Sequence, residues 1–320
     1  MHQTTLLSGI ASDTFQGLSS SPKYLLPKYF YDDIGSLIFQ DIMKMPEYYL
    51  TDCEMEIFSS QKKQIADAFR TGVPNFHLIE LGAGDGLKTK VLLKHLTDSS
   101  AEFNYIPIDI SHKTNDMLVD DLKNEIPDLH VEAKTGDYFH VMDELNKLNG
   151  TRKIILFLGA NIGNYSPDET SGFLQQLSSV THRGDKVLIG FDLKKSPEII
   201  IRAYNDPHGH TRRFNLNHLQ RINRELGANF NIEQFEHHTV YSPHIGMVKS
   251  YLVSNCRQTV FIEALDRKFE FKQWEPIFME LSQKYDLETI QQLAFNSGFE
   301  IEQNFSDTKG YFVDSLWKRV

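Results

Sequence analysis

Cysteine is scarce in this sequence, and long apolar runs are missing from it. The two cysteines, Cys53 and Cys256, carry no metal-ligand spacing and suggest a reducing compartment. No apolar run approaches the roughly 20 residues that a membrane-spanning helix needs. The short apolar stretch 4–10 lacks the basic flank of a signal peptide. These absences predict a cytoplasmic protein without a metal centre.

Positive charge is also in short supply. The chain has 33 Lys and Arg against 43 Asp and Glu, which gives a net charge of −10 at pH 7. Such a surface repels polyanions, so nucleic acid and anionic membranes are not expected partners. The sequence shows no internal repeat and no low-complexity tract. We expect a monomer whose partner is a small molecule.

An alternation of strand, loop and helix begins near residue 76. Five strand-like segments are each followed by a loop: FHLIEL, FNYIPID, LHVEAKT, KIILFL and DKVLIGFDL. Strands that alternate with helices form a parallel sheet with helices on both faces. The pattern therefore predicts an α/β fold with a doubly wound sheet.

Two segments outside that alternation suggest a second, smaller domain. Residues 1–22 are rich in Ser and Thr and predict a loose arm. Helical spacing follows at 35–43 and 51–69, where Thr51 and Glu54 have the spacing of a capping box. After residue 195, helices and loops rich in Asn and His precede two strand patterns, GMVKSYLVS and QTVFIEALDRKFEF. The domains expected are 60–195 with 286–320, and 1–59 with 196–285.

A glycine-rich loop follows the first strand of the alternation. Gly82, Gly84 and Gly86 stand at a strand-to-helix turn, where glycines let the backbone approach a ligand closely. Asp109 ends the next strand and can accept hydrogen bonds from both hydroxyls of a ribose. The alternatives are a tight turn without a ligand, and a helix cap at Asp109, which Ser111 could serve instead.

The details of this loop argue against a dinucleotide. The glycines are spaced Gly-x-Gly-x-Gly, and Lys88 stands near the start of the following helix, whereas a pyrophosphate needs an open helix N-terminus. With Glu80 in front, the form Glu-x-Gly-x-Gly-x-Gly is typical of S-adenosylmethionine-dependent methyltransferases. Asp137 could accept from an adenine amino group and Tyr138 could supply an apolar edge, although Asp137 also fits a turn residue.

The loop after the fourth strand carries unusual chemistry. In FLGANIGNYSP, Gly159 allows a close approach of a second substrate, and Asn164 offers a neutral carboxamide. The fourth strand of a doubly wound sheet lies beside the first, at the edge where ligands bind. Asn164 could also cap the next helix, but Ser166 can do that by itself.

These motifs resemble the bacterial histidine N-alpha-methyltransferases of ergothioneine synthesis, which make trimethylhistidine with S-adenosylmethionine. The similarity runs from PKYFYDDIGS and PEYYLT through FLGANIGN and FNLNHLQRINRELGA to YFVDSLW. It implies a Rossmann-like methyltransferase sheet with a smaller substrate-binding domain. Residues expected to bind the cofactor are Gly82, Gly84, Gly86, Lys88, Asp109, Asp137 and Tyr138. Residues expected to bind or orient the amino-acid substrate are Tyr31, Tyr48, Gly159, Asn164, Tyr204, Met247, Glu263 and Leu265.

One position departs from the family pattern. In the family, the glutamate that faces the imidazole is typically followed two residues later by a serine. In FIEALDRKF, Glu263 is followed by Leu265 at that place. If both side chains share one face of a strand, Leu265 makes the pocket more apolar, and histidine loses one hydrogen bond.

Three other functions stay open on the sequence. The same catalyst could act on another amino acid or small amine. A sensor could bind the cofactor or an amino acid without turnover. A nucleotide-sugar or NAD-dependent oxidoreductase could use a similar sheet, although the glycine spacing argues against it.

Overall fold

The computed structural model describes residues 9–136, 138–145 and 150–320. The chain divides into two compact units, Met1–Tyr49 with Lys195–Ser282 (unit 1) and Leu50–Lys194 with Gln283–Val320 (unit 2). The expected first boundary, 59/60, would cut one continuous helix, α3 (Tyr49–Arg70). The structure instead divides the chain near the start of that helix.

Unit 2 is built on a seven-stranded sheet of order β12-β13-β6-β5-β2-β3-β4. Five strands run parallel: β2 (Asn75–Leu81), β3 (Glu102–Asp109), β4 (Lys134–Thr135), β5 (Arg152–Phe157) and β6 (Lys186–Asp192). Two antiparallel strands, β12 (Phe299–Ser306) and β13 (Phe312–Arg319), complete the edge beside β6. The doubly wound sheet predicted from the sequence is therefore confirmed.

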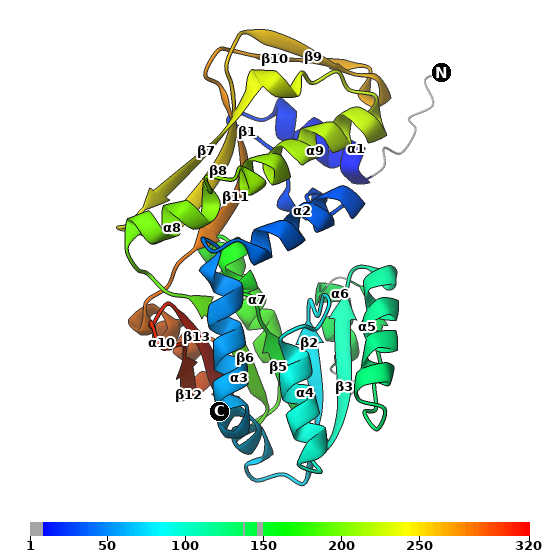
Figure 1. The fold of residues 1–320 in the computed structure, drawn as a ribbon, viewed down its shortest axis with the longest axis vertical. Helices are drawn as coiled ribbons and strands as arrows, with labels where there is room; N and C mark the ends of the chain where they lie inside the picture. The colour runs from blue at the N-terminus through cyan, green and yellow to red at the C-terminus, as the bar shows by residue number, and fades with distance from the viewer. Residues whose placement is uncertain (1–8, 137, 146–149) are drawn as a thin grey trace. The chain divides into compact units, whose positions relative to one another are not determined.

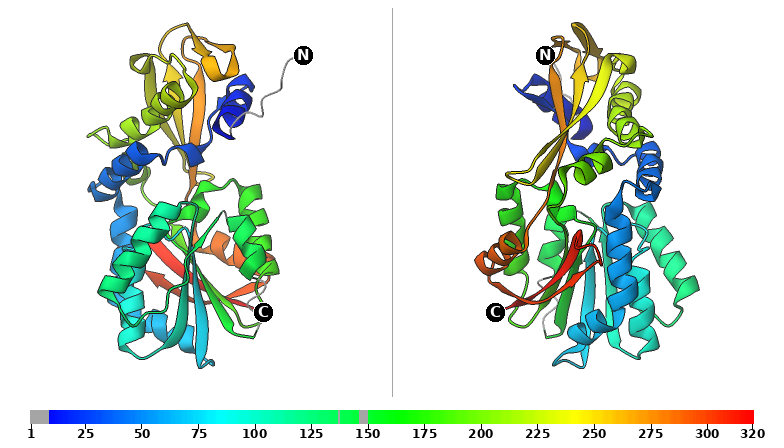
Figure 2. Two further views of the ribbon diagram at one scale, coloured as in Figure 1. Left: turned by 90° about the vertical axis from the view of Figure 1, so that its right-hand side faces the viewer. Right: turned by 60° about the vertical axis from the view of Figure 1, so that its left-hand side comes forward.

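The helices of unit 2 cover both faces of this sheet (Figure 2). Besides α3 they are α4 (Thr89–Asp98), α5 (His112–Glu125), α6 (Tyr138–Leu145), α7 (Pro167–Ser179) and α10 (Leu287–Asn296). The central strands are apolar on both faces, and every residue of β6 is buried. Strands of this kind require a helical layer on each side, because exposing either face would leave apolar surface in water.

Unit 1 holds a four-stranded sheet of order β1-β11-β8-β7 and a separate hairpin of β9 and β10 (Figure 1). The strands are β1 (Lys23–Tyr24), β7 (Phe235–Ser242), β8 (Met247–Ser254), β9 (Gln258–Ile262), β10 (Arg267–Phe271) and β11 (Pro276–Gln283). Its helices are α1 (Gly9–Ser19), α2 (Asp33–Lys44), α8 (Pro197–Tyr204) and α9 (His210–Leu226). Short 3₁₀ turns are η1 (Pro27–Tyr29), η3 (Ile232–Gln234) and η4 (Glu263–Leu265), and unit 2 contains η2 (Asn161–Asn164).

The described part of the N-terminal segment is not a loose arm, and that expectation is wrong. Residues Gly9–Ser19 form α1, whose Ala11 and Leu18 belong to the core of unit 1. Gly17 lies so close to Tyr24 that a Cβ would stand 2.1 Å from the Tyr24 carbonyl oxygen. A sparse apolar stripe and a glycine contact therefore hold this helix, and composition alone did not show either.

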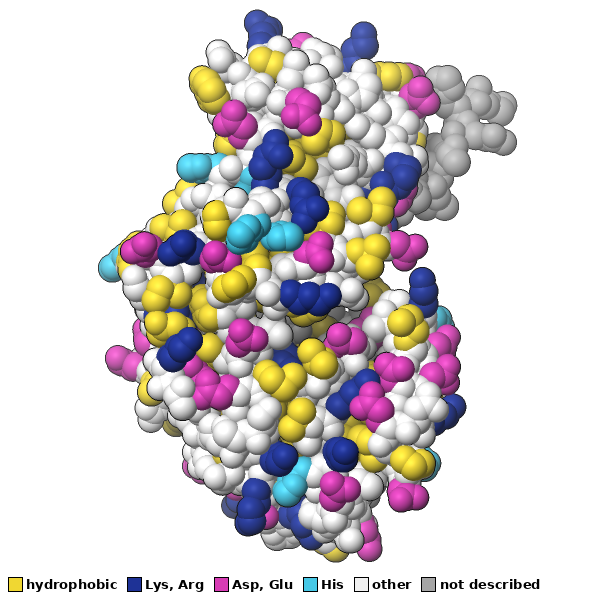
Figure 3. Space-filling model, in the orientation of Figure 1, with side chains coloured by type: hydrophobic (Ala, Val, Ile, Leu, Met, Phe, Trp, Pro, Cys, Tyr) yellow, Lys and Arg dark blue, Asp and Glu magenta, His cyan; other side chains and the backbone are white. Residues whose placement is uncertain are grey.

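The surface shown in Figure 3 mixes charges of both signs. Lys and Arg side chains stand among Asp and Glu, and no part of that face is covered by one sign alone. Within the described ranges, no helix combines the length and apolarity that a bilayer crossing requires.

Candidate functional site

The glycine loop after β2 is a tight turn in a conformation that glycine adopts readily, and it leaves space for a ligand. Gly82, Gly84 and Gly86 all adopt positive φ angles, of 74°, 55° and 64°. A Cβ on Gly82 would stand 2.4 Å from the Tyr138 hydroxyl, whereas a Cβ on Gly84 would meet nothing within 4 Å. The first glycine is thus required by packing, and the second leaves bare backbone at the end of the strand.

Asp109 is placed to serve this loop rather than a helix. Its Oδ2 accepts a hydrogen bond from the Gly84 amide at 3.1 Å, and its Oδ1 accepts one from the Ser111 amide at 2.9 Å. Ser111 caps α5 by accepting from the Thr114 amide. The helix-cap reading of Asp109 is therefore wrong, and the carboxylate retains lone pairs for a ligand hydroxyl.

The aromatic edge expected beside the loop is present. Tyr138 begins α6, and its ring meets that of Phe157 edge to face at 5.7 Å between centroids. Its hydroxyl lies beside Gly82, as the glycine geometry requires. The expected contact of Asp137 lies outside the described residues.

The turn after β5 stands next to the glycine loop because β5 pairs with β2. Gly159 and Ala160 both adopt left-handed φ angles, 72° and 55°. Ala160 carries a Cβ, so this conformation costs roughly 1–2 kcal/mol and persists only where surrounding structure holds it. The Asn161 Nδ2 lies 3.7 Å from the Cβ positions of both Gly82 and Gly159, so this side chain stands between the two loops. Sequence reasoning passed over Asn161, although it is a carboxamide in the same short motif.

Asn164 ends η2 and its side chain is exposed. The following helix, α7, is capped by Ser166, which forms a full capping box with Glu169. Asn164 is therefore not needed as a cap. Its carboxamide is presented at the carboxyl edge of the sheet, where a second substrate would meet the cofactor.

Lys88 is held by a buried carboxylate that the sequence did not reveal. Lys88 precedes α4, and its ammonium pairs with Oε2 of Glu54. Although burial alone would lower it, the Glu54 carboxylate raises the pKa of Lys88 above its usual value. Glu54 is not part of a capping box, because Thr51 lies inside α3, and this expectation is wrong.

Glu80, in front of the glycines, is also buried. Its two oxygens accept hydrogen bonds from the Thr89 hydroxyl at 2.6 Å and the Tyr105 hydroxyl at 2.5 Å. Burial raises the pKa of Glu80 to about 7, against the effect of these hydrogen bonds and of Lys88. Its role is to hold α4 and β3 behind the glycine loop.

In unit 1, Tyr204 and Ser282 form the centre of a polar cluster. Tyr204 ends α8 with 8% of its surface exposed, and its hydroxyl lies 2.8 Å from Oγ of Ser282 on β11. Desolvation, then the Glu280 carboxylate and Tyr204, raise the pKa of Tyr31 above its usual range. Tyr31 as a whole is half exposed.

Tyr31 and Tyr48 share an aromatic neighbour. The Phe39 ring lies 5.4 Å from that of Tyr31 and 6.2 Å from that of Tyr48, both edge to face. Met247, 9% exposed, begins β8, the strand beside β11. The structure therefore places Tyr31, Tyr48, Tyr204 and Met247 in the same unit.

Glu263 and Leu265 do not lie on a strand, so the argument that they share a strand face is wrong. They form the 3₁₀ turn η4 between β9 and β10, and Asp266 then turns left-handed. Glu263 is exposed, and its Oε2 lies 2.7 Å from the Cβ position of Gly227 at the end of α9. Leu265 packs against the apolar core of unit 1.

The glutamate-x-serine spacing that the family resemblance implies is present elsewhere in the chain. Glu280, Leu281 and Ser282 follow one another on β11. The charge of Glu280 helps to raise the pKa of Tyr31, and Ser282 is hydrogen-bonded to Tyr204. Residues two apart on a strand point to the same face. The sequence does contain this Glu-x-Ser pattern, in IFMELSQ, but the segment was not predicted to be a strand, so the pattern was not assigned to the substrate site.

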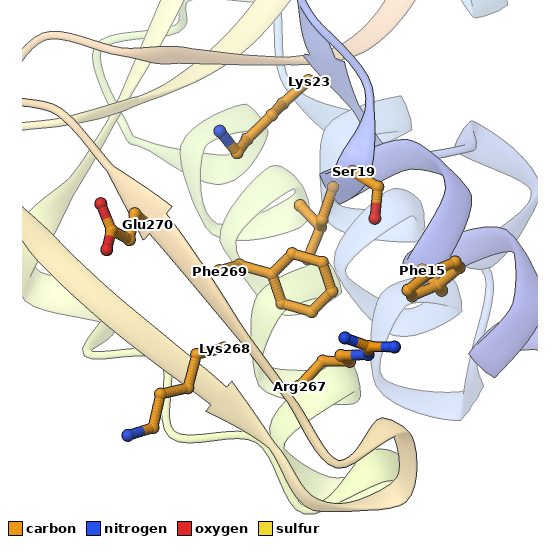
Figure 4. A pocket seen from close by; sticks show the side chains of 8 residues that line it. Phe15, Ser19, Lys23, Arg267, Lys268, Phe269 and Glu270 are labelled. Carbon is orange, nitrogen blue, oxygen red and sulfur yellow. The ribbon is translucent and has the colours of Figure 1, made fainter.

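A separate hollow in unit 1 lies between α1 and β10 (Figure 4). Its lining comes from Phe15, Leu18, Ser19, Lys23 and residues 267–270. Lys23 pairs with Glu275 at 2.5 Å. This lining includes none of the residues expected to bind a substrate or a cofactor, and we assign it no function.

Comparison with known proteins agrees with this geometry. Residues 10–319 match the family described as histidine-specific, S-adenosylmethionine-dependent methyltransferases. The histidine N-alpha-methyltransferase of Mycobacterium tuberculosis (strain CDC 1551 / Oshkosh) is 33% identical over 95% of this chain and 93% of its own. That of Mycolicibacterium smegmatis is 32% identical over the same shares. An L-tryptophan methyltransferase of Psilocybe serbica is 27% identical over 88% of this chain and 84% of its own.

The residues at the edge of the unit 2 sheet fit S-adenosylmethionine. Bare backbone at Gly84 leaves room for the ligand, Asp109 offers a carboxylate for ribose hydroxyls, and Lys88 offers a cation. Together with the match over nearly the whole chain, these features settle the class of enzyme. The chain belongs to the family of histidine-specific methyltransferases, and it is an N-methyltransferase whose cofactor is S-adenosylmethionine.

Proposed function

We propose that this enzyme methylates the α-amino group of free L-histidine, yielding trimethylhistidine. The observation that carries the proposal is the polar cluster of unit 1. In this cluster the negative charge of Glu280 helps to raise the pKa of Tyr31, and Ser282 is hydrogen-bonded to Tyr204. A carboxylate and a hydroxyl two residues apart on one strand can each meet one nitrogen of an imidazole ring, the carboxylate by accepting from an N–H.

The tyrosines of this cluster suit the other end of the amino acid. A tyrosine hydroxyl is protonated at neutral pH, and the raised pKa of Tyr31 extends that range, so Tyr31 can act as a donor. Donors of this kind can bind a carboxylate directly or through water. Tyr204 is fixed by Ser282 and by its own carbonyl, which accepts from the Thr239 hydroxyl at 2.8 Å. We assign Tyr31 and Tyr204 to the carboxylate, and Tyr48 and Met247 to the wall around the side chain.

The residues of unit 2 supply orientation rather than acid–base chemistry. The bound cofactor supplies an electrophilic methyl group on a sulfonium. Asn164 and the Gly159 carbonyl would accept hydrogen bonds from the substrate amine and aim its lone pair, a positioning effect that can account for several kcal/mol of the barrier. Asp109, Lys88 and the glycine loop would hold the cofactor. We assign no general base.

A second acceptor with a ring N–H is an alternative. A tryptophan methyltransferase is among the relatives, and an indole N–H could donate to Glu280 as an imidazole N–H does. An indole has no second ring nitrogen for the Ser282 hydroxyl, so we place histidine first.

The test is incubation of the enzyme with S-adenosylmethionine and a mixture of the twenty amino acids, with methylated products read by mass spectrometry. We expect trimethylhistidine. The variants Glu280→Gln and Glu263→Gln then compare two carboxylates of one unit. We expect the first to raise the KM for histidine roughly tenfold or more, as for one charged hydrogen bond, and the second to leave it unchanged. The absence of any N-alpha-methylated amino acid would refute the substrate class.

A further inference from the structure

The carboxylate of Glu54 joins three separate segments of unit 2. Glu54 lies on α3 and its side chain is fully buried. Its Oε1 and Oε2 accept a hydrogen bond from the Gly159 amide at 2.8 and 3.1 Å, and Oε2 also pairs with the Lys88 ammonium. One carboxylate therefore contacts both Lys88, just before α4, and Gly159, in the turn after β5.

The sheet is shaped to admit this carboxylate. Gly190 lies in the middle of β6, where a Cβ would stand 2.6 Å from Oε1 of Glu54. Gly190 is not among the residues of positive φ, so backbone conformation does not require a glycine there. The Glu54 carboxylate, at 2.6 Å, and the Phe312 ring, at 3.0 Å, together occupy the space that a side chain would need.

A second buried carboxyl group lies beside the first. Asp314 pairs with Gly190 across the sheet, and it is fully buried. Neither of its oxygens accepts a hydrogen bond from any of the described residues. Burial, and then the negative Glu54, raise the pKa of Asp314 well above its usual value, against the effect of Lys88. Burial therefore favours the neutral form of Asp314, whereas the Lys88 ammonium and the Gly159 amide both meet Glu54.

We propose that Glu54 is a positioning residue for methyl transfer, whose carboxylate fixes the Lys88 ammonium and the Gly159 turn relative to one another. This rests on the proposed function, in which Lys88 holds the cofactor and Gly159 orients the amine. Because one carboxylate serves both, loss of its charge affects cofactor affinity through Lys88 and turnover through Gly159.

The central variant is Glu54→Gln, which keeps the shape of the side chain and removes its charge. The matched control is Asp67→Asn, which removes a charge from an exposed carboxylate on the same helix, paired with Lys63 at 2.7 Å. We expect Glu54→Gln to weaken S-adenosylhomocysteine binding in calorimetry by about ten- to a hundredfold, as for one charge-assisted contact. We also expect a lower kcat at saturating cofactor, and no change in either quantity for Asp67→Asn.

A double-mutant cycle separates the two routes. In a Lys88→Met background, Glu54→Gln should weaken cofactor binding little further, because the ammonium it serves is already gone. It should still lower kcat, because the Gly159 amide still loses its hydrogen bond to a charged carboxylate. Additive losses of affinity would contradict the part of the proposal that acts through Lys88.

A second variant covers the case in which Glu54→Gln does not fold. Gly190→Ala changes no charge, and its methyl group would push against the Glu54 carboxylate at 2.6 Å and the Phe312 ring at 3.0 Å. We expect weaker cofactor binding and a lower kcat, whereas the control Asp67→Asn leaves both unchanged. A folded Glu54→Gln or Gly190→Ala protein with wild-type affinity and kcat would overturn the proposal. Because calorimetry needs no acceptor, a wild-type protein that binds S-adenosylhomocysteine but does not methylate histidine would count against the proposed function alone.

Discussion

The Ser282 Oγ lies 2.8 Å from the Tyr204 hydroxyl, and this hydrogen bond ties β11 to the end of α8. Either atom can be the donor. If Tyr204 donates to a substrate carboxylate, Ser282 must donate to Tyr204, and the serine then sets the direction of the phenolic O–H. With its one proton donated to Tyr204, the serine oxygen can only accept from the acceptor, as it would from an N–H of a protonated imidazole ring.

Removal of that hydroxyl should therefore weaken acceptor binding. We expect Ser282→Ala to raise the KM for histidine about two- to tenfold, as for the loss of one neutral hydrogen bond. Affinity for S-adenosylhomocysteine should not change. Steady-state kinetics at saturating cofactor measure the first effect and calorimetry the second. Tyr204→Phe and the double variant complete a cycle, and coupling near zero would show that the two hydroxyls act independently.

Asn164→Ala should abolish turnover while cofactor binding survives. The side chain is exposed at the carboxyl edge of the sheet, and Ser166 already caps α7, so the substitution removes a functional group without removing a cap. Single-turnover assays measure the methyl transfer and calorimetry measures the binding of S-adenosylhomocysteine. A variant with near-wild-type kcat would refute our assignment of Asn164 to the amine, and one that fails to bind cofactor would move it to the cofactor site.

Asp109→Ala should weaken cofactor binding by roughly 1.5–3 kcal/mol, the range for a charge-assisted hydrogen bond. Part of this loss would come from the loop itself, because Asp109 also accepts from the Gly84 and Ser111 amides. Asp109→Asn is the control, since one amide oxygen can still accept from the backbone. Affinity equal to that of the wild type in calorimetry on the alanine variant would exclude Asp109 from the ribose.

Leu265→Ser distinguishes the strand interpretation from the observed turn. If Leu265 faced the acceptor, a serine would raise kcat/KM for histidine up to about tenfold. In the structure Leu265 belongs to a 3₁₀ turn and packs on the core of unit 1. We therefore expect no gain in kcat/KM and a stability loss of about 1–2 kcal/mol from lost apolar contact. Urea unfolding and steady-state kinetics on the same preparation give both numbers, and a clear gain in activity would restore the original interpretation.

The sheet of unit 2 was predictable from the sequence because its strands are unambiguous. Residues 154–158 are a short unbroken apolar run that ends at a glycine, which is typical of a central strand buried on both faces. The capping serines at 111 and 166 marked the next helices correctly. Local chemistry and fold agree at these places.

The acceptor cluster of unit 1 was not predictable, because its strands are weakly patterned. In β11, IFMELSQ mixes buried and half-buried positions, so Glu280 did not stand out as functional. The role of Glu54 was hidden for another reason. Thr-x-x-Glu is the spacing of a capping box, and the real partner, Gly159, lies 105 residues further along the chain. Spacing along the chain identifies local partners and cannot identify a distant one.

His218 should make unit 1 sensitive to acid. It lies on α9 with no exposed surface, 5.4 Å from the Phe30 ring and 6.0 Å from the Tyr29 ring between centroids. Neither ring nitrogen bonds any of the described residues. Burial, and then Arg221, lower the pKa of His218 to about 3, against the effect of Asp32.

The sign of the pH effect follows from this lowered pKa. The unfolded histidine gains a proton below its ordinary pKa of 6.5, while the folded one stays neutral down to about 3. Stability from this group is therefore complete above 6.5 and is lost as the pH falls toward 3. At pH 4.5 the unfolded group lies two units below its pKa, so the loss is about 2–3 kcal/mol. Between pH 7 and pH 4.5, the free energy of unfolding in urea should therefore fall by about 2–3 kcal/mol less for His218→Phe than for the wild type. Wild-type and variant proteins with equal pH dependence would show that His218 does not titrate on unfolding.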